Sequence, residues 1–160
     1  QPLKGGMDMN QLYYTKSASI IHRQTNRFYD RALASFHVGC GQQFFLAKIY
    51  EHNGISMYDL AKTGHFDKGT VTKAVQKLEE LGYIQSCADA DDRRIRRLYT
   101  TPAAEPVIET LRQSKQRWDR VLTESLSPEE AAELLRLMTK MAENAYHYIE
   151  KGVSESNANP

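Results

Sequence analysis

The chain has 160 residues, of which 41% are hydrophobic and 26% charged, and its formal net charge is +1. This length is sufficient for one hydrophobic core, but a second independent domain would be cramped. No apolar run approaches the length needed to cross a bilayer and no signal-peptide pattern is present, so we expect a cytoplasmic protein without membrane contact.

A long helix is predicted over residues 10–36. A helix of this length extends about 30 Å or more, which is enough to wrap around a second copy of the chain. Residues 1–9 before it are interpreted as a disordered lead or an expression remnant, and residues 151–160 at the other end as a flexible tail. The apolar positions of the helix are Ile20, Ile21, Phe28, Tyr29, Ala32, Leu33 and Phe36.

Two shorter helices joined by a turn are predicted next. Ser56 can cap the first helix and Asp67 the second, because their side-chain oxygens accept backbone N–H groups. Gly64 lies in the connecting turn, where it tolerates backbone angles that a side chain resists. The second helix ends before Gly82, and its buried stripe comprises Val71, Ala74, Val75, Leu78 and Leu81.

The opposite face of the second helix is polar and basic. Exposed lysines and hydroxyls on one helix face suit contacts with phosphates and base edges, although an ordinary solvated helix face has the same composition. Four side chains there are predicted contacts with DNA, namely Lys68, Thr70, Thr72 and Lys73.

A β-hairpin is predicted after the helices, with strands over residues 83–87 and 95–101. Its tip and second strand carry four arginines within five residues, and arginine is the side chain most often inserted into a narrow minor groove. At least one tip aspartate is expected to pair with an arginine and fix its direction. An ordinary charged hairpin tip is the alternative interpretation. The charged residues are Asp89, Asp91, Asp92, Arg93, Arg94, Arg96 and Arg97.

Two long helices complete the predicted fold. Thr101 and Pro102 open the first, because proline loses no hydrogen bond in the first helical turn. Residues 127–130 form a capping box that opens the second. The apolar positions cover more than one helix face, which predicts a second copy packed against them and disfavours a monomeric helical bundle. These positions are Val107, Ile108, Leu111, Trp118, Val121, Leu122, Leu134, Leu135, Leu137, Met138, Met141, Ala145, Tyr146 and Ile149.

Several of these segments together resemble the MarR family of bacterial winged-helix regulators. The matching runs are Leu60-Ala61, Thr70-Val71-Thr72, Leu78-Glu79, Gly82-Tyr83-Ile84, Asp92-Arg93-Arg94 and Thr101-Pro102. The resemblance covers residues 10–150. The chain departs from the family pattern at Thr100 and Ala104, where such proteins usually have leucine and glycine, and this affects the packing of the second wing strand.

The resemblance implies a mainly α fold with a small β-wing. A winged helix-turn-helix DNA-binding domain would occupy residues 37–101, and a helical dimerisation region residues 10–36 and 102–150. The expected function is that of a homodimeric regulator, most simply a repressor, bound to an inverted repeat in promoter DNA. Ser56 is expected near a phosphate, Arg94 in the minor groove, and Arg93 and Arg96 on the DNA backbone.

The resemblance also implies a pocket for a small aromatic or phenolic effector between the winged module and the dimerising helices. Side chains that combine aromatic surface with polar groups are candidates for such a pocket, although core or interface roles are the alternative. The candidates are His22, Asn26, Tyr29, His37 and Trp118.

Other chemistries are weakly supported by the sequence. Cys40 lies near the start of a helix, which could lower its pKa and permit redox sensing; a buried or unreactive thiol is the alternative. The histidines and cysteines lack the paired spacing of metal ligands, so no metal site is expected. The sequence also lacks a nucleophile paired with a base and lacks a phosphate-binding loop, so we expect neither an enzyme nor a cofactor. A winged-helix adaptor that binds protein remains the rival function, because a fold does not determine its use.

Overall fold

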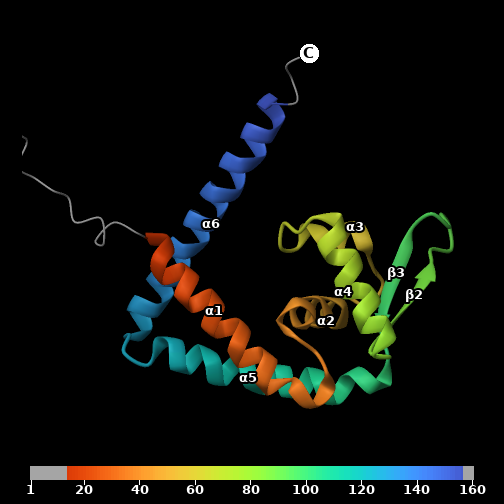
Figure 1. Cartoon of the computed structure of the whole chain (residues 1–160), viewed down its shortest axis with the longest axis horizontal. Helices are drawn as coiled ribbons and strands as arrows, with labels where there is room; N and C mark the ends of the chain where they lie inside the picture. Colours follow the sequence, from red (N-terminus) through yellow and green to blue (C-terminus); the bar gives the residue numbers. More distant parts are fainter. Residues whose placement is uncertain (1–13, 157–160) are drawn as a thin grey trace, which may run out of the picture. The chain divides into compact units, whose positions relative to one another are not determined.

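The computed structural model describes residues 14–156, with side chains described for residues 14–152 (Figure 1). The predicted lead at 1–9, the start of the predicted first helix at 10–13, and residues 157–160 of the predicted tail lie outside the described residues. The chain divides into two compact units, Gln1–Trp118 and Asp119–Pro160, which are described separately.

Helices dominate the first unit. The 3-10 segment η2 (Pro102–Ala104) leads directly into the helix α5 (Glu105–Thr123), so a helical segment opens after Thr101 as predicted, and α5 continues beyond the unit boundary. In chain order, the helices are α1 (Tyr14–Ala32), η1 (Ala34–Phe36), α2 (Cys40–Glu51), α3 (Met57–Lys62), α4 (Lys68–Glu80), η2 (Pro102–Ala104) and α5 (Glu105–Thr123).

The predicted caps of α3 and α4 are confirmed. The backbone N–H of Asp59 donates to Ser56 Oγ at 3.0 Å, and the N–H of Thr70 donates to Asp67 Oδ1 at 2.8 Å. Each bond satisfies a donor that the first helical turn leaves without a backbone partner. Gly82 follows α4 with φ +77°, a left-handed conformation that ends the helix at little steric cost.

The wing belongs to a three-stranded antiparallel sheet. β2 (Ile84–Ala88) and β3 (Arg96–Thr100) form the predicted hairpin, which extends away from the helices in Figure 1. A third strand, β1 (Ile55–Ser56), was not predicted and makes the sheet order β1-β3-β2. Arg97 in the central strand lies between Ser56 and Cys87. The residue that caps α3 is therefore paired with the wing.

One hydrophobic core holds the helix-turn-helix and the sheet together. The predicted stripe of α4 is confirmed: Val71, Ala74, Val75 and Leu78 are buried, and Leu81 is half-buried. Side chains from the neighbouring elements complete this core, including Leu33, Phe45, Leu46, Ile49, Leu60, Leu98 and Val107.

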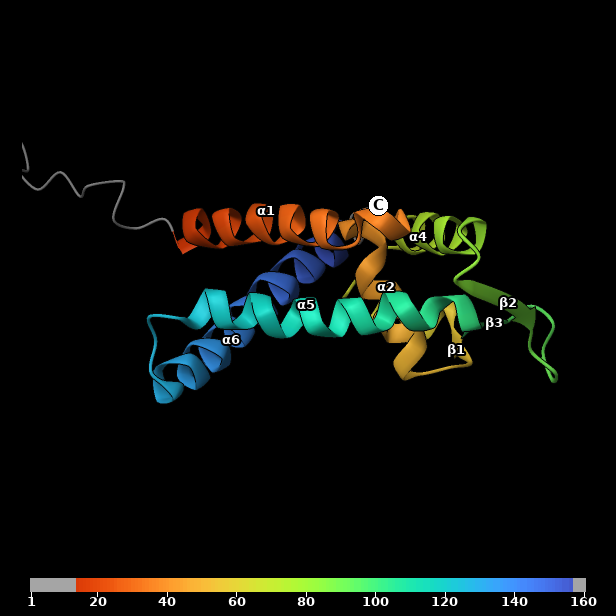
Figure 2. The ribbon, with the colours of Figure 1, turned by 90° about the horizontal axis from the view of Figure 1, so that it is seen from below.

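Aromatic stacking joins α1 to α5 within the first unit. The rings of Phe28 and Trp118 are stacked with their centroids 4.6 Å apart. The indole N–H of Trp118 donates to Thr25 Oγ1 at 2.9 Å. Figure 2 shows α1 running alongside this part of α5.

The second unit contains the end of α5 and α6 (Pro128–Ser156). The predicted capping box is confirmed, because Ser127 and Glu130 each accept the backbone N–H of the other through their side chains. None of the described α6 side chains is buried. No helix within residues 14–156 is long and apolar enough to cross a membrane. The large exposed apolar residues of α6 are Leu134, Leu135, Leu137, Met138, Met141, Tyr148 and Ile149.

Removing the fully buried Leu78 side chain should test how the core holds α4. Leu78→Ala should lower the free energy of unfolding by about 2–5 kcal/mol, because it removes apolar contacts and leaves a cavity. The matched change at exposed Gln76 in the same helix should alter it by no more than about 0.5 kcal/mol. Urea unfolding followed by circular dichroism measures both values, and equal effects would contradict this packing.

Candidate nucleic-acid interface

The outer face of α4 presents two ammonium groups and two hydroxyls. Lys68, Thr70 and Lys73 are exposed, Thr72 is half-buried, and neither lysine forms an ion pair within the described residues. The Thr70 hydroxyl donates to Asp67 Oδ2 at 2.7 Å, and the Thr72 hydroxyl donates to the Lys68 carbonyl at 2.8 Å. Each hydroxyl hydrogen is therefore engaged within the protein, which leaves the two oxygens as acceptors toward a ligand.

The predicted pairing of a tip aspartate with an arginine is confirmed at Asp92. Its Oδ1 accepts the Nε–H of Arg94 at 3.0 Å, and its Oδ2 accepts the Nη2–H at 2.8 Å. The Arg94 side chain is 90% exposed although it is held at two points. Its guanidinium therefore projects into solvent, and the bidentate pair with Asp92 favours one direction and plane for it.

A second pair lies deeper in the wing, between Arg97 and Asp89. The Nε of Arg97 is 2.7 Å from Asp89 Oδ2, and its Nη1 donates to the Gly54 carbonyl at 3.3 Å. The hydrogen bond from Arg97, followed by those from the backbone N–H groups of Asp92 and Asp91, lowers the pKa of Asp89 to about 2. Asp89 is therefore fully ionised at neutral pH.

The remaining wing arginines differ in their contacts. Arg96 donates to the Ser86 carbonyl at 3.2 Å and also contacts the Ser86 hydroxyl. Arg93 is exposed at the tip and forms no ion pair within the described residues. The two arginines therefore present cationic groups at different points along the hairpin.

A cleft of about 780 Å³ separates the start of α3 and α4 from the wing. Its apolar lining comes from Met57, Ala61, Val71 and Ile95. The structure brings four predicted contact residues to this cleft, while Thr70, Thr72, Lys73 and Arg93 are not among its lining residues. The four are Ser56, Lys68, Arg94 and Arg96.

Ser56 and Tyr58 lie differently in this cleft. Ser56 is buried, and its hydroxyl donates to Asp59 Oδ2 at 2.9 Å in addition to capping α3. Tyr58 is exposed, and the Lys62 ammonium lies 4.1 Å from the centroid of its ring. The sequence interpretation missed Tyr58 and Lys62, although their spacing of four residues in a helix is a signal that could have paired them.

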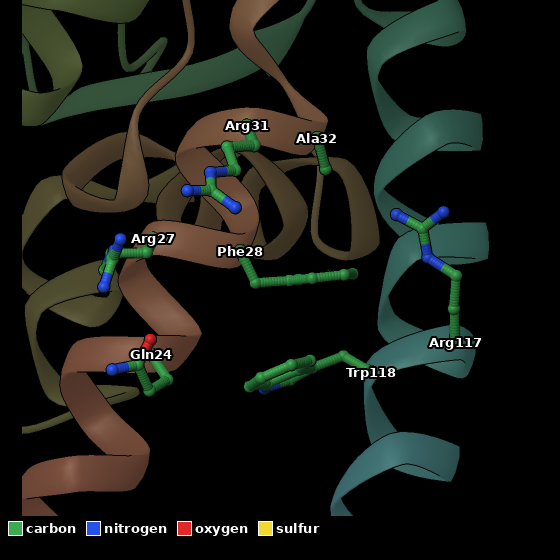
Figure 3. A pocket seen from close by; sticks show the side chains of 7 residues that line it. All are labelled: Gln24, Arg27, Phe28, Arg31, Ala32, Arg117 and Trp118. Atoms are coloured by element: carbon green, nitrogen blue, oxygen red, sulfur yellow. The ribbon is translucent and has the colours of Figure 1, made fainter.

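The predicted effector residues are not brought together. Tyr29 belongs to the hydrophobic core, His22 pairs with Asn26 on an exposed face of α1, and His37 follows η1 with φ +59°. Only Trp118 of the predicted set lines the cavity of about 450 Å³ between α1 and α5 (Figure 3). The other lining residues are Gln24, Arg27, Phe28, Arg31, Ala32 and Arg117.

The side chains that line the cavity between α1 and α5 carry more positive charge than the predicted effector residues. Arg27, Arg31 and Arg117 form no ion pair within residues 14–152, and the Arg117 guanidinium lies 5.1 Å from the centroid of the Phe28 ring. The spacing of Arg27 and Arg31 places them on one face of α1, which was a usable sequence signal. The sequence could not show that these two arginines lie near Arg117, because that proximity depends on how α1 and α5 pack.

The start of a helix does not lower the pKa of Cys40, which favours the unreactive thiol over the redox sensor. Cys40 begins α2, and its backbone N–H donates to Asp30 Oδ1 at 2.7 Å. Burial raises the pKa of the thiol, and the nearby Asp30 carboxylate raises it further because a thiolate would be repelled. Within residues 14–152, no group of three or more His, Cys, Asp or Glu side chains could hold a metal ion.

Alkylation should show the effect of Asp30 on Cys40. A raised pKa leaves less thiolate at neutral pH, so Cys40 should react with iodoacetamide more slowly than free N-acetylcysteine. Asp30→Asn keeps an oxygen for the Cys40 N–H but removes the charge, and should accelerate the reaction. Mass spectrometry of the labelled peptide at several pH values gives the rates. A wild-type rate above that of the free thiol would contradict the raised pKa.

Comparison with known proteins shows the same fold and related sequences. Residues 41–95 match the MarR family. A similar protein is the uncharacterized HTH-type transcriptional regulator YybA of Bacillus subtilis, which is 31% identical over 115 residues, or 70% of this chain and 77% of YybA.

Solved structures agree with this assignment. The MarR protein from Peptoclostridium difficile DA00132 is 28% identical, has a TM-score of 0.82, and is matched over 94% of this chain and 97% of its own. The S. aureus MepR–DNA complex has the same fold, with a TM-score of 0.76 at 22% identity over 82% of this chain and 97% of MepR. The capped helix pair, the hairpin wing and the similarity to YybA agree, and the chain belongs to the MarR family of winged helix-turn-helix transcriptional regulators.

Proposed function

We propose that this protein binds double-stranded DNA as a homodimer and regulates transcription from an inverted-repeat promoter site in the cytoplasm. One observation carries this proposal: Lys68, at the start of the basic face of α4, and the exposed guanidinium of Arg94 line the same cleft. A helix that reads a major groove and a hairpin that enters the adjacent minor groove need this proximity, because both grooves belong to one duplex.

In the proposed complex, α4 lies in the major groove. Lys68 and Lys73 contact phosphates, since their ammonium groups are not neutralised by carboxylates of the described chain. Thr70 and Thr72 offer oxygen acceptors, which suit the amino groups of adenine and cytosine in that groove. These contacts combine a sequence-independent attraction to the backbone with recognition of base edges.

The wing supplies the second part of the proposed interface. Arg94 enters the minor groove with its guanidinium already oriented by Asp92, while Arg93 and Arg96 contact the DNA backbone. The sugar–phosphate strand between the grooves lies in the cleft, with its deoxyribose carbons against the apolar lining and its phosphates near Lys68. The predicted phosphate contact of Ser56 is not retained, because its buried hydroxyl already donates to Asp59 Oδ2. The solved complex of MepR with DNA supports this use of the shared fold.

A second copy of the chain is proposed to cover the exposed apolar side chains of α6. On this helix Leu134, Met138, Met141 and Ile149 recur at helical spacing and are all exposed. Covering them would hold two winged modules at a fixed spacing, which matches two half-sites of an inverted repeat. Occupation of promoter DNA by this dimer would block polymerase, which makes repression the simplest outcome.

We propose that the cavity beside Phe28 and Trp118 receives the small aromatic or phenolic effector. The stacked rings offer an apolar surface, and the surrounding guanidinium groups favour a ligand that carries negative charge. A ligand there would contact both α1 and α5, and so could alter the spacing of the two DNA-binding modules in the dimer. This regulation depends on the proposed homodimer.

Removing the Arg94 side chain should weaken DNA binding without unfolding the protein. Loss of a minor-groove contact should lower affinity about tenfold, within the range of roughly 1–3 kcal/mol for a specific contact. The matched control is Arg112→Ala, because Arg112 is an exposed arginine of α5 that is paired within its own helix. Fluorescence anisotropy measures binding to a duplex that the wild-type protein selects from a random pool, and thermal melting monitors folding.

The same titrations repeated at several salt concentrations test the electrostatic part of the proposal. Wild-type affinity should fall steeply with salt, because bound lysines and arginines release counterions from the duplex. No selected duplex, or a flat salt response, would contradict DNA binding and favour a protein-binding adaptor. Equal losses in Arg94→Ala and Arg112→Ala would contradict the assignment of Arg94.

Charge introduced into the apolar stripe of α6 should dissociate the homodimer. Multi-angle light scattering of the wild type should give about twice the monomer mass of 18.3 kDa. The variant Met138→Glu/Met141→Glu should give the monomer mass, because each carboxylate would be buried without a partner. Lys140→Glu adds negative charge outside this stripe and should remain dimeric. A monomeric wild type would contradict the paired half-sites.

A further inference from the structure

A continuous chain of hydrogen bonds connects the central strand of the sheet to the exposed guanidinium of Arg94. Arg97 Nε contacts Asp89 Oδ2 at 2.7 Å, and Asp89 Oδ1 accepts the backbone N–H of Asp92 at 3.0 Å. The carboxylate of Asp92 then accepts the backbone N–H of Arg94 at 3.0 Å as well as both guanidinium contacts. Every step of this chain uses at least one charged group, and such hydrogen bonds are shorter and stronger than neutral ones.

Arg97 is the end of this hydrogen-bond series that is held in the sheet. It lies in the central strand β3, and its guanidinium also donates to the Gly54 carbonyl just before β1. Its side chain is 35% exposed and that of Asp89 is 17% exposed, so this pair is better shielded from solvent than the pair at the tip. A partly buried pair is screened less by salt than an exposed one, and its geometry is held more firmly.

The wing tip has little other support. None of residues 89–95 is buried, and two backbone hydrogen bonds close the loop, from Asp89 to Ile95 and from Ile95 to Asp92. Those bonds determine the local turn, but both lie within the tip itself. Of the polar contacts that the Asp89 carboxylate makes, the one with Arg97 reaches out of the tip into the sheet.

We propose that Arg97 is a positioning residue, which orients Arg94 for the minor groove through Asp89 and Asp92. This proposal rests on the proposed DNA binding and deepens it, because the orientation of Arg94, which contacts DNA, is assigned to Arg97, which does not. Arg97 contributes by limiting the conformations of the tip before DNA arrives. Less conformational freedom is then lost on binding, which increases affinity without an additional contact.

A double-mutant cycle between Arg97 and Arg94 tests this assignment. Arg97→Gln alone should weaken binding to the selected duplex by about fivefold to tenfold, and Arg94→Ala by about tenfold. In the Arg94→Ala protein, Arg97→Gln should weaken binding by no more than about twofold, because the side chain that it orients is already absent. Fully additive losses would show that Arg97 contacts DNA itself, and would overturn the proposal.

Arg96 offers a matched control in the same strand. It is exposed, and its guanidinium contacts Ser86 on the neighbouring strand instead of the tip aspartates. Arg96→Gln should therefore weaken binding by a similar factor in the wild-type and Arg94→Ala proteins. If Arg96 and Arg97 showed the same dependence on Arg94, the coupling would reflect the whole wing, and Arg97 would have no distinct positioning role.

A measurement without DNA keeps the test independent of affinity. In the wild-type protein, NMR titration of the Asp89 carboxyl should give a pKa of about 2, and Arg97→Gln should raise it toward the ordinary value of 3.8. The backbone N–H groups of Asp91 and Asp92 should also exchange faster with solvent in this variant. An unchanged Asp89 pKa and unchanged exchange would overturn the proposal.

Asp89→Asn provides a second variant if Arg97→Gln does not fold. The amide oxygen can still accept the backbone N–H groups of Asp91 and Asp92, but the charge that holds Arg97 is lost. This variant should show the same dependence on Arg94, and an effect that adds fully to Arg94→Ala would overturn the positioning role. Absence of any duplex binding by the wild type would instead contradict the proposed function, whereas the NMR result would still decide whether Arg97 orders the tip.

Discussion

The pairing of β1 with β3 is the constraint on which the arrangement of helix and wing depends. The strand β1 has only two residues, and Ile55 lies opposite Leu98 and Ser56 opposite Arg97. Ser56 also caps α3, so the start of the helix-turn-helix and the middle of the wing share one residue pair. The buried side chain of Leu98 then fastens this junction to the core that also holds Leu60 and Leu78. The direction of the hairpin relative to α4 follows from this junction.

Local signals in the sequence were sufficient for most of the elements. Ser56, Asp67 and the capping box at 127–130 were predicted correctly because a cap involves residues only a few positions apart. The buried stripe of α4 was predicted from its periodicity for the same reason. β1 was missed because two residues cannot show an alternating pattern. Its strand character comes from β3, more than forty positions later in the chain by the Ile55–Leu98 pairing.

The side-chain chemistry was less predictable than the backbone, because it depends on contacts between distant segments. The helix start at Cys40 was compatible with a lowered pKa, but burial of the thiol and the Asp30 carboxylate of α1 raise it instead. Trp118 was a reasonable pocket candidate, yet the arginines that surround it could be grouped only once α1 and α5 were packed together. An arginine–aspartate pair was expected in the wing, whereas the two separate pairs and their connection through Asp89 required the folded hairpin.

A substitution at Gly54 would disturb folding far more than one at an exposed position of α4. Its φ is +92°, and a Cβ there would come within 3.3 Å of the Tyr99 hydroxyl oxygen, so no other residue fits easily. The carbonyl of Gly54 accepts a hydrogen bond from Arg97, and its N–H donates to the Leu98 carbonyl. Selection for folding should thus keep glycine at this position, while the exposed positions of α4 are constrained by the DNA they contact and can change with it. Preferences for different operators can evolve on such a scaffold without any change to the joint that supports them.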